Sequence, residues 1–358
     1  MKYVDEYRQP EALRALAQTI RKMGVSGARL MEVCGTHTMA AARFGLHDLL
    51  AGVVRLSSGP GCPVCVTAQR EIDLFIEMGR LSHVTLASFG DMVRVPGTRS
   101  SLERERARGA RVEVVYSPME AVGLAAQSGR EVVFFAVGFE TTAPGIAVSL
   151  MEARRRGIRN FSILCAHKTM PAALEALASS QIKVDGFMLP GHVSTIIGAR
   201  AYEFLPTRRG VACVISGFEP MDMLQSVMML LGQIRNGSPR VEIQYRRAVS
   251  REGNRAAQEI MAKVFEPCDV EWRGLGMIAG SGLKLRPEWA DFDAPSRFQV
   301  PVPESKEPQG CRCGEVLAGT AEPWECELFG QACTPEDPVG ACMVSSEGTC
   351  AAWHRYRR

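Results

Sequence analysis

Cysteine spacing marks two places in this 358-residue chain where sulfur chemistry is expected. The first holds Cys34 and a Cys-x-x-Cys pair formed by Cys62 and Cys65. The second lies near the C-terminus, where four cysteines fall within 25 residues: Cys326, Cys333, Cys342 and Cys350. Thiolates bind iron and exchange with disulfides, so the sequence predicts a protein that handles iron and electrons.

Cys34 follows an apolar run at residues 30–33 and precedes Gly35-Thr-His-Thr38, which predicts a turn from a strand into a helix. Backbone N–H groups and the positive end of a helix favour the thiolate form of such a cysteine. We expect His37 to tune this thiolate or to contribute a hydrogen bond. A small buried cysteine without a role is the alternative interpretation, and the second thiol site nearby favours a functional one.

The pair Cys62 and Cys65 lies in a tight turn, Gly59-Pro-Gly-Cys-Pro-Val-Cys65. Its spacing suits either a reversible disulfide or half of a tetrahedral metal site. The sequence has no second Cys-x-x-Cys to complete a zinc site. We therefore favour a redox-active pair over zinc.

The four C-terminal cysteines supply the thiolates that a [4Fe–4S] cluster needs, although their gaps of six, eight and seven residues are not the ferredoxin spacing. Zinc is the alternative, and its sites usually contain two short Cys-x-x-Cys pairs. Cys311 and Cys313, just upstream, could substitute as ligands. We prefer the later four because they are spread evenly through one compact stretch.

Two further polar residues follow strand-like runs. Gly138-Phe-Glu-Thr-Thr142 ends one run with the carboxylate of Glu140 and two hydroxyls, and a helix N-cap is the plainer interpretation of its threonines. His192 occupies in the second half of the chain the place that Cys62 holds in the first. The candidate catalytic residues are therefore Cys62, Cys65, His37, Glu140 and His192.

Short apolar runs alternate with helix-like segments, which is typical of an α/β protein with parallel sheets. The predicted strands cover residues 30–33, 53–56, 84–87, 112–116, 132–137, 162–165, 186–189 and 211–215. Residues 11–23 are apolar at helical spacing and predict an N-terminal helix.

Three motifs recur in the same order about 130 positions later. Cys34-Gly-Thr-His-Thr-Met is matched by Cys165-Ala-His-Lys-Thr-Met, Pro60-Gly-Cys62 by Pro190-Gly-His192, and residues 111–116 by residues 240–245. The repeat predicts two related α/β lobes that arose by duplication and whose motifs face each other across a cleft. The predicted organisation is an N-terminal helix (1–25), lobe one (26–140), lobe two (141–285), a linker (286–310) and a cluster module (311–358).

Composition excludes several classes of function. A net charge of +3 does not indicate nucleic-acid binding. The sequence contains no run of 18 apolar residues and no basic-then-apolar leader, so we expect a cytoplasmic protein that does not enter a membrane. In that reducing compartment, twelve cysteines are better explained by metal binding, catalysis or burial than by disulfides.

In combination, the motifs resemble those of the HypD family of [NiFe]-hydrogenase maturation factors, from about residue 10 to the C-terminus. Leu189 stands where glycine is expected. The motifs that carry the resemblance are Cys34-Gly-Thr-His-Thr, Gly59-Pro-Gly-Cys-Pro-Val-Cys65, Gly138-Phe-Glu-Thr-Thr-Ala-Pro144, Pro190-Gly-His-Val-Ser194, Cys333-Thr-Pro-Glu and Cys342-Met-Val-Ser-Ser-Glu-Gly348.

The resemblance implies a redox-active scaffold, rather than a conventional turnover enzyme, on which the Fe(CN)2CO unit of the hydrogenase is assembled. Cys34 would bind the iron together with a small HypC-type chaperone, and a HypE-type protein would donate cyanide. Cys62 and Cys65 would be the redox pair and the C-terminal cluster would supply electrons, in a layout similar to ferredoxin:thioredoxin reductase.

The anionic cyanides would need hydrogen-bond donors, for which Thr36, His37 and His192 are candidates. Two other classes of function remain open at this point. One is a disulfide reductase acting through Cys62 and Cys65, and the other is a binding module whose C-terminus is folded by zinc.

Overall fold

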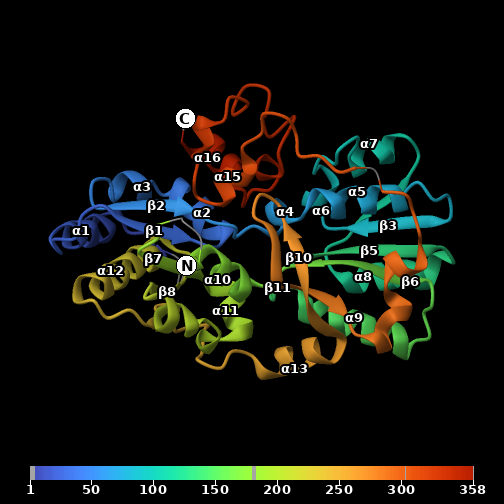
Figure 1. The fold of residues 1–358 in the computed structure, drawn as a ribbon, viewed down its shortest axis with the longest axis horizontal. Helices are drawn as coiled ribbons and strands as arrows, with labels where there is room; N and C mark the ends of the chain where they lie inside the picture. Colours follow the sequence, from blue (N-terminus) through green and yellow to red (C-terminus); the bar gives the residue numbers. More distant parts are fainter. Residues whose placement is uncertain (1–4, 180–182, 303, 358) are drawn as a thin grey trace.

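Two parallel β-sheets flanked by helices form the framework of the protein, which confirms the predicted α/β class (Figure 1). The computed structural model describes residues 5–179, 183–302 and 304–357. The five-stranded sheet has the strand order β2-β1-β7-β8-β9, and the four-stranded sheet has the order β4-β3-β5-β6. All neighbouring strands within these two sheets are parallel.

The strands of the two parallel sheets are β1 (Ala28–Glu32), β2 (Val54–Ser58), β3 (Val84–Ser88), β4 (Arg111–Val114), β5 (Glu131–Gly138), β6 (Phe161–His167), β7 (Gly186–Pro190), β8 (Ala212–Ser216) and β9 (Val241–Ile243). A separate antiparallel hairpin consists of β10 (Phe265–Trp272) and β11 (Gly276–Leu285). The α-helices are α1 (Pro10–Arg21), α2 (Gly35–Arg43), α3 (Leu46–Leu49), α4 (Pro63–Val66), α5 (Gln69–Met78), α6 (Gly90–Val93), α7 (Leu102–Ala107), α8 (Pro118–Ser128), α9 (Ala143–Arg155), α10 (Met170–Ser179), α11 (Gly191–Ile197), α12 (Pro220–Asn236), α13 (Arg255–Val264), α14 (Ala294–Arg297), α15 (Cys313–Leu317) and α16 (Thr349–Tyr356).

The inner strands are largely buried because helices cover both faces of each sheet. Every residue of β3, β7 and β8 is buried, as parallel sheets require. Helix boundaries follow local chemistry. At the start of α8, for example, Ser117 Oγ accepts the Glu120 N–H at 3.3 Å, and the helix ends at Gly129 in the left-handed conformation (φ 61°).

The chain crosses between the sheets twice. Strands β1 and β2 belong to the five-stranded sheet, β3 to β6 form the other sheet, and β7 to β9 return to the first. The predicted lobes, 26–140 and 141–285, therefore do not coincide with the sheets. In particular, β5 and β6 pair with each other across residue 140.

The repeated motifs nevertheless fall on equivalent elements, because β1, β2 and β4 match β6, β7 and β9 in the repeat. The repeat shows which elements correspond in sequence. It does not show which sheet each strand joins, because that depends on the connections between the strands. The duplication stays a prediction.

The eight predicted strands are all present, with ends shifted by a few residues. The hairpin β10–β11 was not predicted. It lies along β6 and α10, and its tip reaches the C-terminal module (Figure 1).

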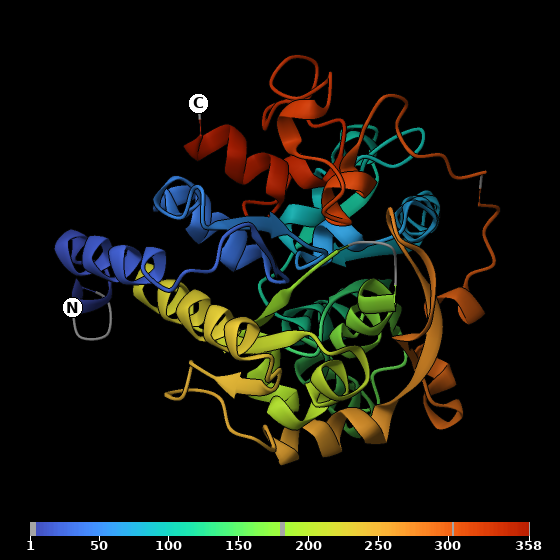
Figure 2. The same ribbon diagram turned by 60° about the vertical axis from the view of Figure 1, so that its left-hand side comes forward.

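The predicted linker, 286–310, is only partly a linker. Its first half contains α14, which packs on β6, and Arg297 donates to Glu131 at 2.7 Å. Its second half is fastened to α5, because Asp73 on that helix accepts hydrogen bonds from Thr98 and Ser305 at 2.6 Å each. The module that follows is built from α15, α16 and turns, and it lies on the side of α2 and α4 (Figure 2).

The predicted N-terminal helix is α1, which buries Ala17 and Ile20 and packs on α12. In the part of the chain that the structure describes, no helix is long and apolar enough to cross a membrane.

Candidate functional site

Four neighbouring strands of the five-stranded sheet bring the first candidate site together. Beyond the carboxyl ends of β2, β1, β7 and β8 lie, in that order, Cys62, Cys34, His192 and Phe218. Parallel strands all end at the same edge of a sheet, which is where ligand sites form in such folds. The prediction that repeated motifs face each other across a cleft is wrong for Cys62 and His192, because both belong to this one row on either side of Cys34.

The turns that carry Cys34 and Cys62 interlock. Gly35 N donates to Gly61 O at 3.0 Å. A side chain at Gly61 would overlap the backbone of Cys34, so only glycine permits this approach. The first of the two cysteines in the Cys-x-x-Cys pair is therefore held next to Cys34.

Cys34 is the N-cap of α2, as predicted, and is almost fully buried. Burial and, next, the carboxylate of Glu347 raise the pKa of its thiol to about 12, while hydrogen bonds from Thr36 and His37 lower it. The prediction that the helix end favours the thiolate is therefore wrong for the protein alone. A cation bound at the sulfur is what would favour deprotonation.

Glu347 brings the C-terminal module to this site. Thr36 Oγ1 donates to Glu347 Oε1 at 2.6 Å, and a side chain at Gly35 would overlap the backbone of Glu347. The sequence analysis quoted Glu347 within a motif and gave it no role. Nothing in the local sequence indicates that it contacts a residue 311 positions away.

His37 and His192 lie against Phe218, with ring centroids 4.8 Å and 3.9 Å from the phenyl ring. His37 Nε2 is 3.0 Å from Gly217 O. A carbonyl only accepts, so Nε2 carries the hydrogen and Nδ1 is an acceptor. Nδ1 is buried without a partner among the described residues, and burial lowers the pKa of His37 to about 4. The ring is neutral near pH 7, and its single N–H is already used.

Glu140 enters from the other sheet, at the end of β5. Its Oε1 accepts the Met170 N–H at 2.9 Å, and its Oε2 is buried with no partner in the described chain. Burial raises the pKa of Glu140 to about 7. Tyr202, which the sequence analysis did not identify, is fully buried, and its pKa is raised by burial and then by the charges of Glu140 and Cys34.

Replacing Glu140 with glutamine should flatten the pH dependence of stability. Below pH 4.5 the folded and unfolded chains both hold the proton, so burial costs nothing at this residue. Between about pH 4.5 and 7 the unfolded chain releases its proton first, and the folded state loses up to about 3 kcal/mol. Glutamine removes this loss and can still accept from Met170.

Urea unfolding at pH 5 and pH 8 checks this prediction. We expect the free energy of unfolding of the variant to exceed that of the wild type at pH 8, and the difference to shrink towards pH 5. If the free energies of unfolding of the variant and the wild type differed by the same amount at pH 5 and pH 8, the raised pKa of Glu140 would be contradicted.

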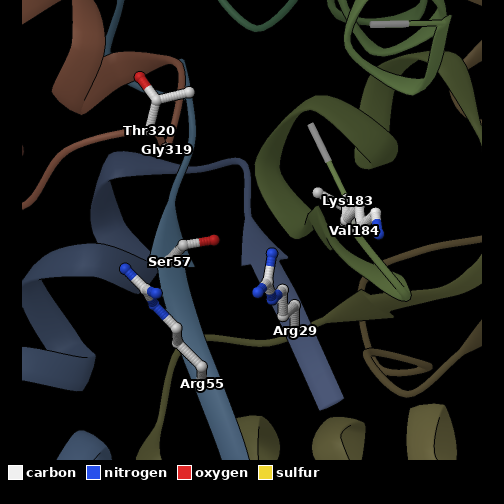
Figure 3. A pocket seen from close by; sticks show the side chains of 7 residues that line it. All are labelled: Arg29, Arg55, Ser57, Lys183, Val184, Gly319 and Thr320. Carbon is white, nitrogen blue, oxygen red and sulfur yellow. The ribbon is translucent and has the colours of Figure 1, made fainter. Parts of the chain in front are cut away.

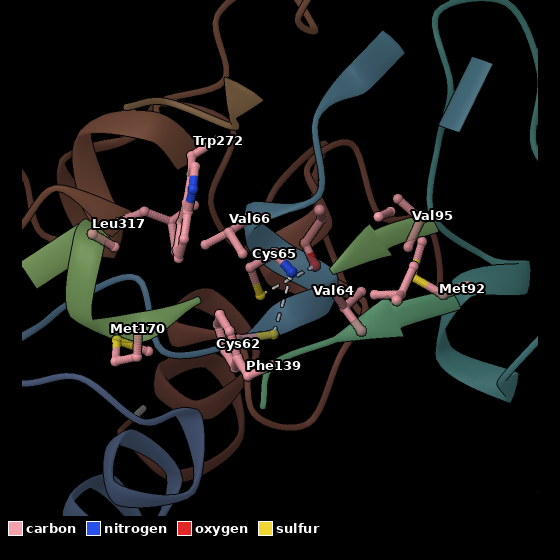
Figure 4. Close-up of a cluster of buried hydrophobic side chains, with 14 of the residues drawn as sticks. Cys62, Val64, Cys65, Val66, Met92, Val95, Phe139, Met170, Trp272 and Leu317 are labelled. Carbon is pink, nitrogen blue, oxygen red and sulfur yellow. Dashed lines mark hydrogen bonds between the residues drawn. The ribbon is translucent and has the colours of Figure 1, made fainter. Parts of the chain in front are cut away.

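Cys62 is the N-cap of α4 and Cys65 lies within this helix. Cys62 Sγ accepts the Cys65 N–H at 3.3 Å (Figure 4). Cys65 is fully buried, next to Val66 and Phe139 in this apolar cluster (Figure 4). Its Sγ is 4.0 Å from Ala341 O in the module. Burial is the main reason why the pKa of Cys65 lies well above its ordinary value, and a side-chain hydrogen bond with Cys342 lowers this pKa in part.

All six cysteines of the module line one small apolar pocket: Cys311, Cys313, Cys326, Cys333, Cys342 and Cys350. Cys313 Sγ and Cys342 Sγ lie 2.7 Å apart. Val339 N donates to Cys333 Sγ at 3.3 Å, a contact that suits a thiolate.

The donors that line this pocket are thiols, which is the kind of ligand that an iron–sulfur cluster needs. Within the described ranges, no three His, Cys, Asp or Glu side chains converge closely enough to hold a single metal ion. The predicted ligands Cys326, Cys333, Cys342 and Cys350 are thus brought together, and so are Cys311 and Cys313.

A larger cavity, of about 530 Å³, lies away from these thiols (Figure 3). Arg29, Arg55 and Lys183 line it, near the amino ends of β1, β2 and β7, and the module contributes Gly319 and Thr320. None of the predicted site residues lines this cavity.

The fold and the site define a class of protein in which two parallel β-sheets, flanked by helices, and a cysteine-rich module enclose buried thiols. The family model HypD, described as "Hydrogenase formation hypA family", matches residues 11–357. The hydrogenase maturation factor HypD of Azotobacter vinelandii is 46% identical, and the alignment covers 100% of this chain and 97% of that protein. HypD of Escherichia coli K12 is 44% identical over 100% of this chain and 99% of that protein. The hydrogenase expression/formation protein HupD of Azotobacter chroococcum is 46% identical over the same shares as the first.

The chain belongs to the HypD family of hydrogenase maturation factors.

Proposed function

We propose that this maturation factor is a scaffold that binds iron at Cys34 and supports assembly of the Fe(CN)2CO unit of [NiFe]-hydrogenase. The observation that carries the proposal is a continuous series of sulfur sites. The turn of Cys62 interlocks with the turn of Cys34, and Cys65 lies against the module whose pocket is lined by six cysteines.

Iron is the cargo in this proposal, and Cys34 Sγ is its anchor. Iron that carries cyanide and carbon monoxide suits a soft thiolate ligand. A thiol with a raised pKa must lose its proton when metal binds, so iron uptake at Cys34 should be favoured by higher pH. Three side chains were expected to donate hydrogen bonds to the cyanides. Two of them, Thr36 and His37, already donate to Glu347 and Gly217. His192 is therefore the side chain that remains to donate to a cyanide.

The module would hold a [4Fe–4S] cluster through four of its six cysteines, with Cys326, Cys333, Cys342 and Cys350 as the proposed set. Bound there, it would supply electrons one at a time. Cys62 and Cys65 would convert between dithiol and disulfide, releasing two electrons and two protons on oxidation. Their place between the module and Cys34 supports this role.

The redox role of the pair has a direct test. After the protein is poised at a series of potentials, thiol labelling should detect Cys62 and Cys65 becoming unreactive together. Cys62→Ser should block hydrogenase maturation while the cluster absorbance remains. Cys213→Ser, at another buried cysteine, is the control and should mature hydrogenase normally.

Independent labelling of the two thiols at every potential, or normal maturation by Cys62→Ser, would exclude the redox role. The partners in the proposal are a HypC-type chaperone that shares the iron and a HypE-type protein that donates cyanide.

A further inference from the structure

Arg273 is a fully buried cation near the thiol sites, and the proposed function gives it no role. Its side chain is 1% exposed. It lies at the tip of the hairpin between β10 and β11, next to Trp272, which bridges to Thr67 just after α4. Burying a guanidinium costs several kcal/mol unless partners compensate for the lost water.

The partners of Arg273 come from two parts of the chain, the end of α4 and the segment before Cys311. Its backbone N–H donates to Val66 O at 3.0 Å, and its Nε donates to Thr67 O at 3.1 Å. Its Nη1 donates to Glu307 Oε2 at 3.0 Å. Arg273 therefore joins the Cys62–Cys65 helix to the segment that leads into the cysteine module.

The compensation is incomplete. Nη2 is buried without a hydrogen-bond partner among the described residues. The paired carboxylate of Glu307 is half exposed, so water weakens its effect on the buried guanidinium. The positive charge inside the protein is therefore only partly compensated.

The hairpin tip that carries this charge packs on the cysteine module. A side chain at Gly274 would overlap the Cα of Gly314, so the hairpin tip rests directly on the start of α15, next to Cys313. The guanidinium is bonded to Glu307, four residues before Cys311. It is therefore held close to the segments that carry Cys311 and Cys313.

We propose that Arg273 is a positioning residue whose charge raises the reduction potential of the cluster held in the six-cysteine pocket. The inference rests on the proposed function, because it assumes a redox-active cluster there. Reduction adds one electron to a group that four thiolates already make negative. A fixed positive charge nearby favours the reduced state.

Redox titration of the anaerobic full-length protein, with dithionite as the electron source and cluster absorbance as the readout, tests this role. We expect Arg273→Gln to shift the midpoint potential to a more negative value, by roughly the 59 mV that corresponds to a tenfold change for one electron. Arg273→Lys keeps the charge and should stay near the wild-type potential. Glu307→Gln removes the opposing charge and should shift the potential in the positive direction.

The control is Arg155→Gln, which removes an exposed arginine paired with Glu152 on α9 and should leave the potential unchanged. An Arg273→Gln protein with a full cluster and the wild-type potential would overturn the inference, and so would equal shifts in the glutamine and lysine variants. If Arg273→Gln fails to hold a cluster, the Glu307→Gln variant tests the inference instead. A positive shift of its midpoint potential supports the inference, and a negative shift or none overturns it. A wild-type protein without a redox-active cluster would contradict the proposed function itself.

Discussion

Replacing Cys34 with alanine is expected to abolish binding of the assembly iron and maturation of hydrogenase. Loss of residues that merely support a metal ligand commonly costs 10-fold to 100-fold in affinity, so loss of the anchoring ligand should cost about 100-fold or more. Iron held in the cysteine module should remain, because that pocket is lined by other cysteines. Iron content per chain and hydrogenase activity in a complemented strain are the measurements.

Cys213→Ala is the matched control for this prediction. Cys213 is also buried, but it lies within β8 and its Sγ is 3.5 Å from Val211 O. The control variant should retain both iron pools and normal maturation. If Cys34→Ala bound iron as the wild type does and matured hydrogenase, Cys34 could not be the anchor.

Removing a cluster ligand should have the second large effect. Alanine at Cys326, Cys333, Cys342 or Cys350 is expected to eliminate most cluster absorbance and to loosen the module, because metal binding and folding are coupled in small cysteine-rich domains. The module has few regular elements besides α15 and α16, so it should become sensitive to proteases. Absorbance, iron content and limited proteolysis are the measurements.

Cys311→Ala is the control within the same pocket and should retain the cluster. Cys268→Ala, on β10, is the control outside it. If the Cys311 or Cys313 variant lost the cluster while one of the four proposed ligands tolerated alanine, the ligand set would be wrong. The pocket itself does not distinguish the six cysteines, since all of them line it.

The edge of the sheet that carries the site could be predicted from the sequence. Each buried parallel strand appears as an apolar run, and the polar residues that follow it must lie at the carboxyl edge. Cys34, Cys62 and His192 were found in this way. Their order in the sheet could not be predicted, because it depends on which neighbours β1 selects, and β1 pairs with β7 as well as β2.

Contacts between distant segments were missed for a related reason. Phe218 lies in a Gly-Phe-Glu sequence that repeats residues 138–140, and Glu347 lies in a motif, but neither pattern indicates which residues they contact. The hairpin strands were missed because charged residues interrupt β10 and β11 is rich in glycine. Neither strand gives the continuous apolar run by which the others were recognised.

The state of the Cys34 thiol shows how two effects compete. A helix end stabilises a nearby negative charge by at most about 2 kcal/mol. The net rise of the thiol pKa from 9.0 to about 12 corresponds to about 4 kcal/mol in the opposite direction. Burial therefore outweighs the helix end, and burial could not be judged from the sequence around Cys34.

Infrared spectroscopy of the protein, isolated anaerobically together with its small chaperone, tests the central claim most directly. We expect absorption bands from cyanide and carbon monoxide bound to iron, and we expect these bands to disappear in the Cys34→Ala variant. A maturation-competent complex that carries its iron but has no such bands, or a Cys34→Ala complex with bands of wild-type intensity, would contradict this claim.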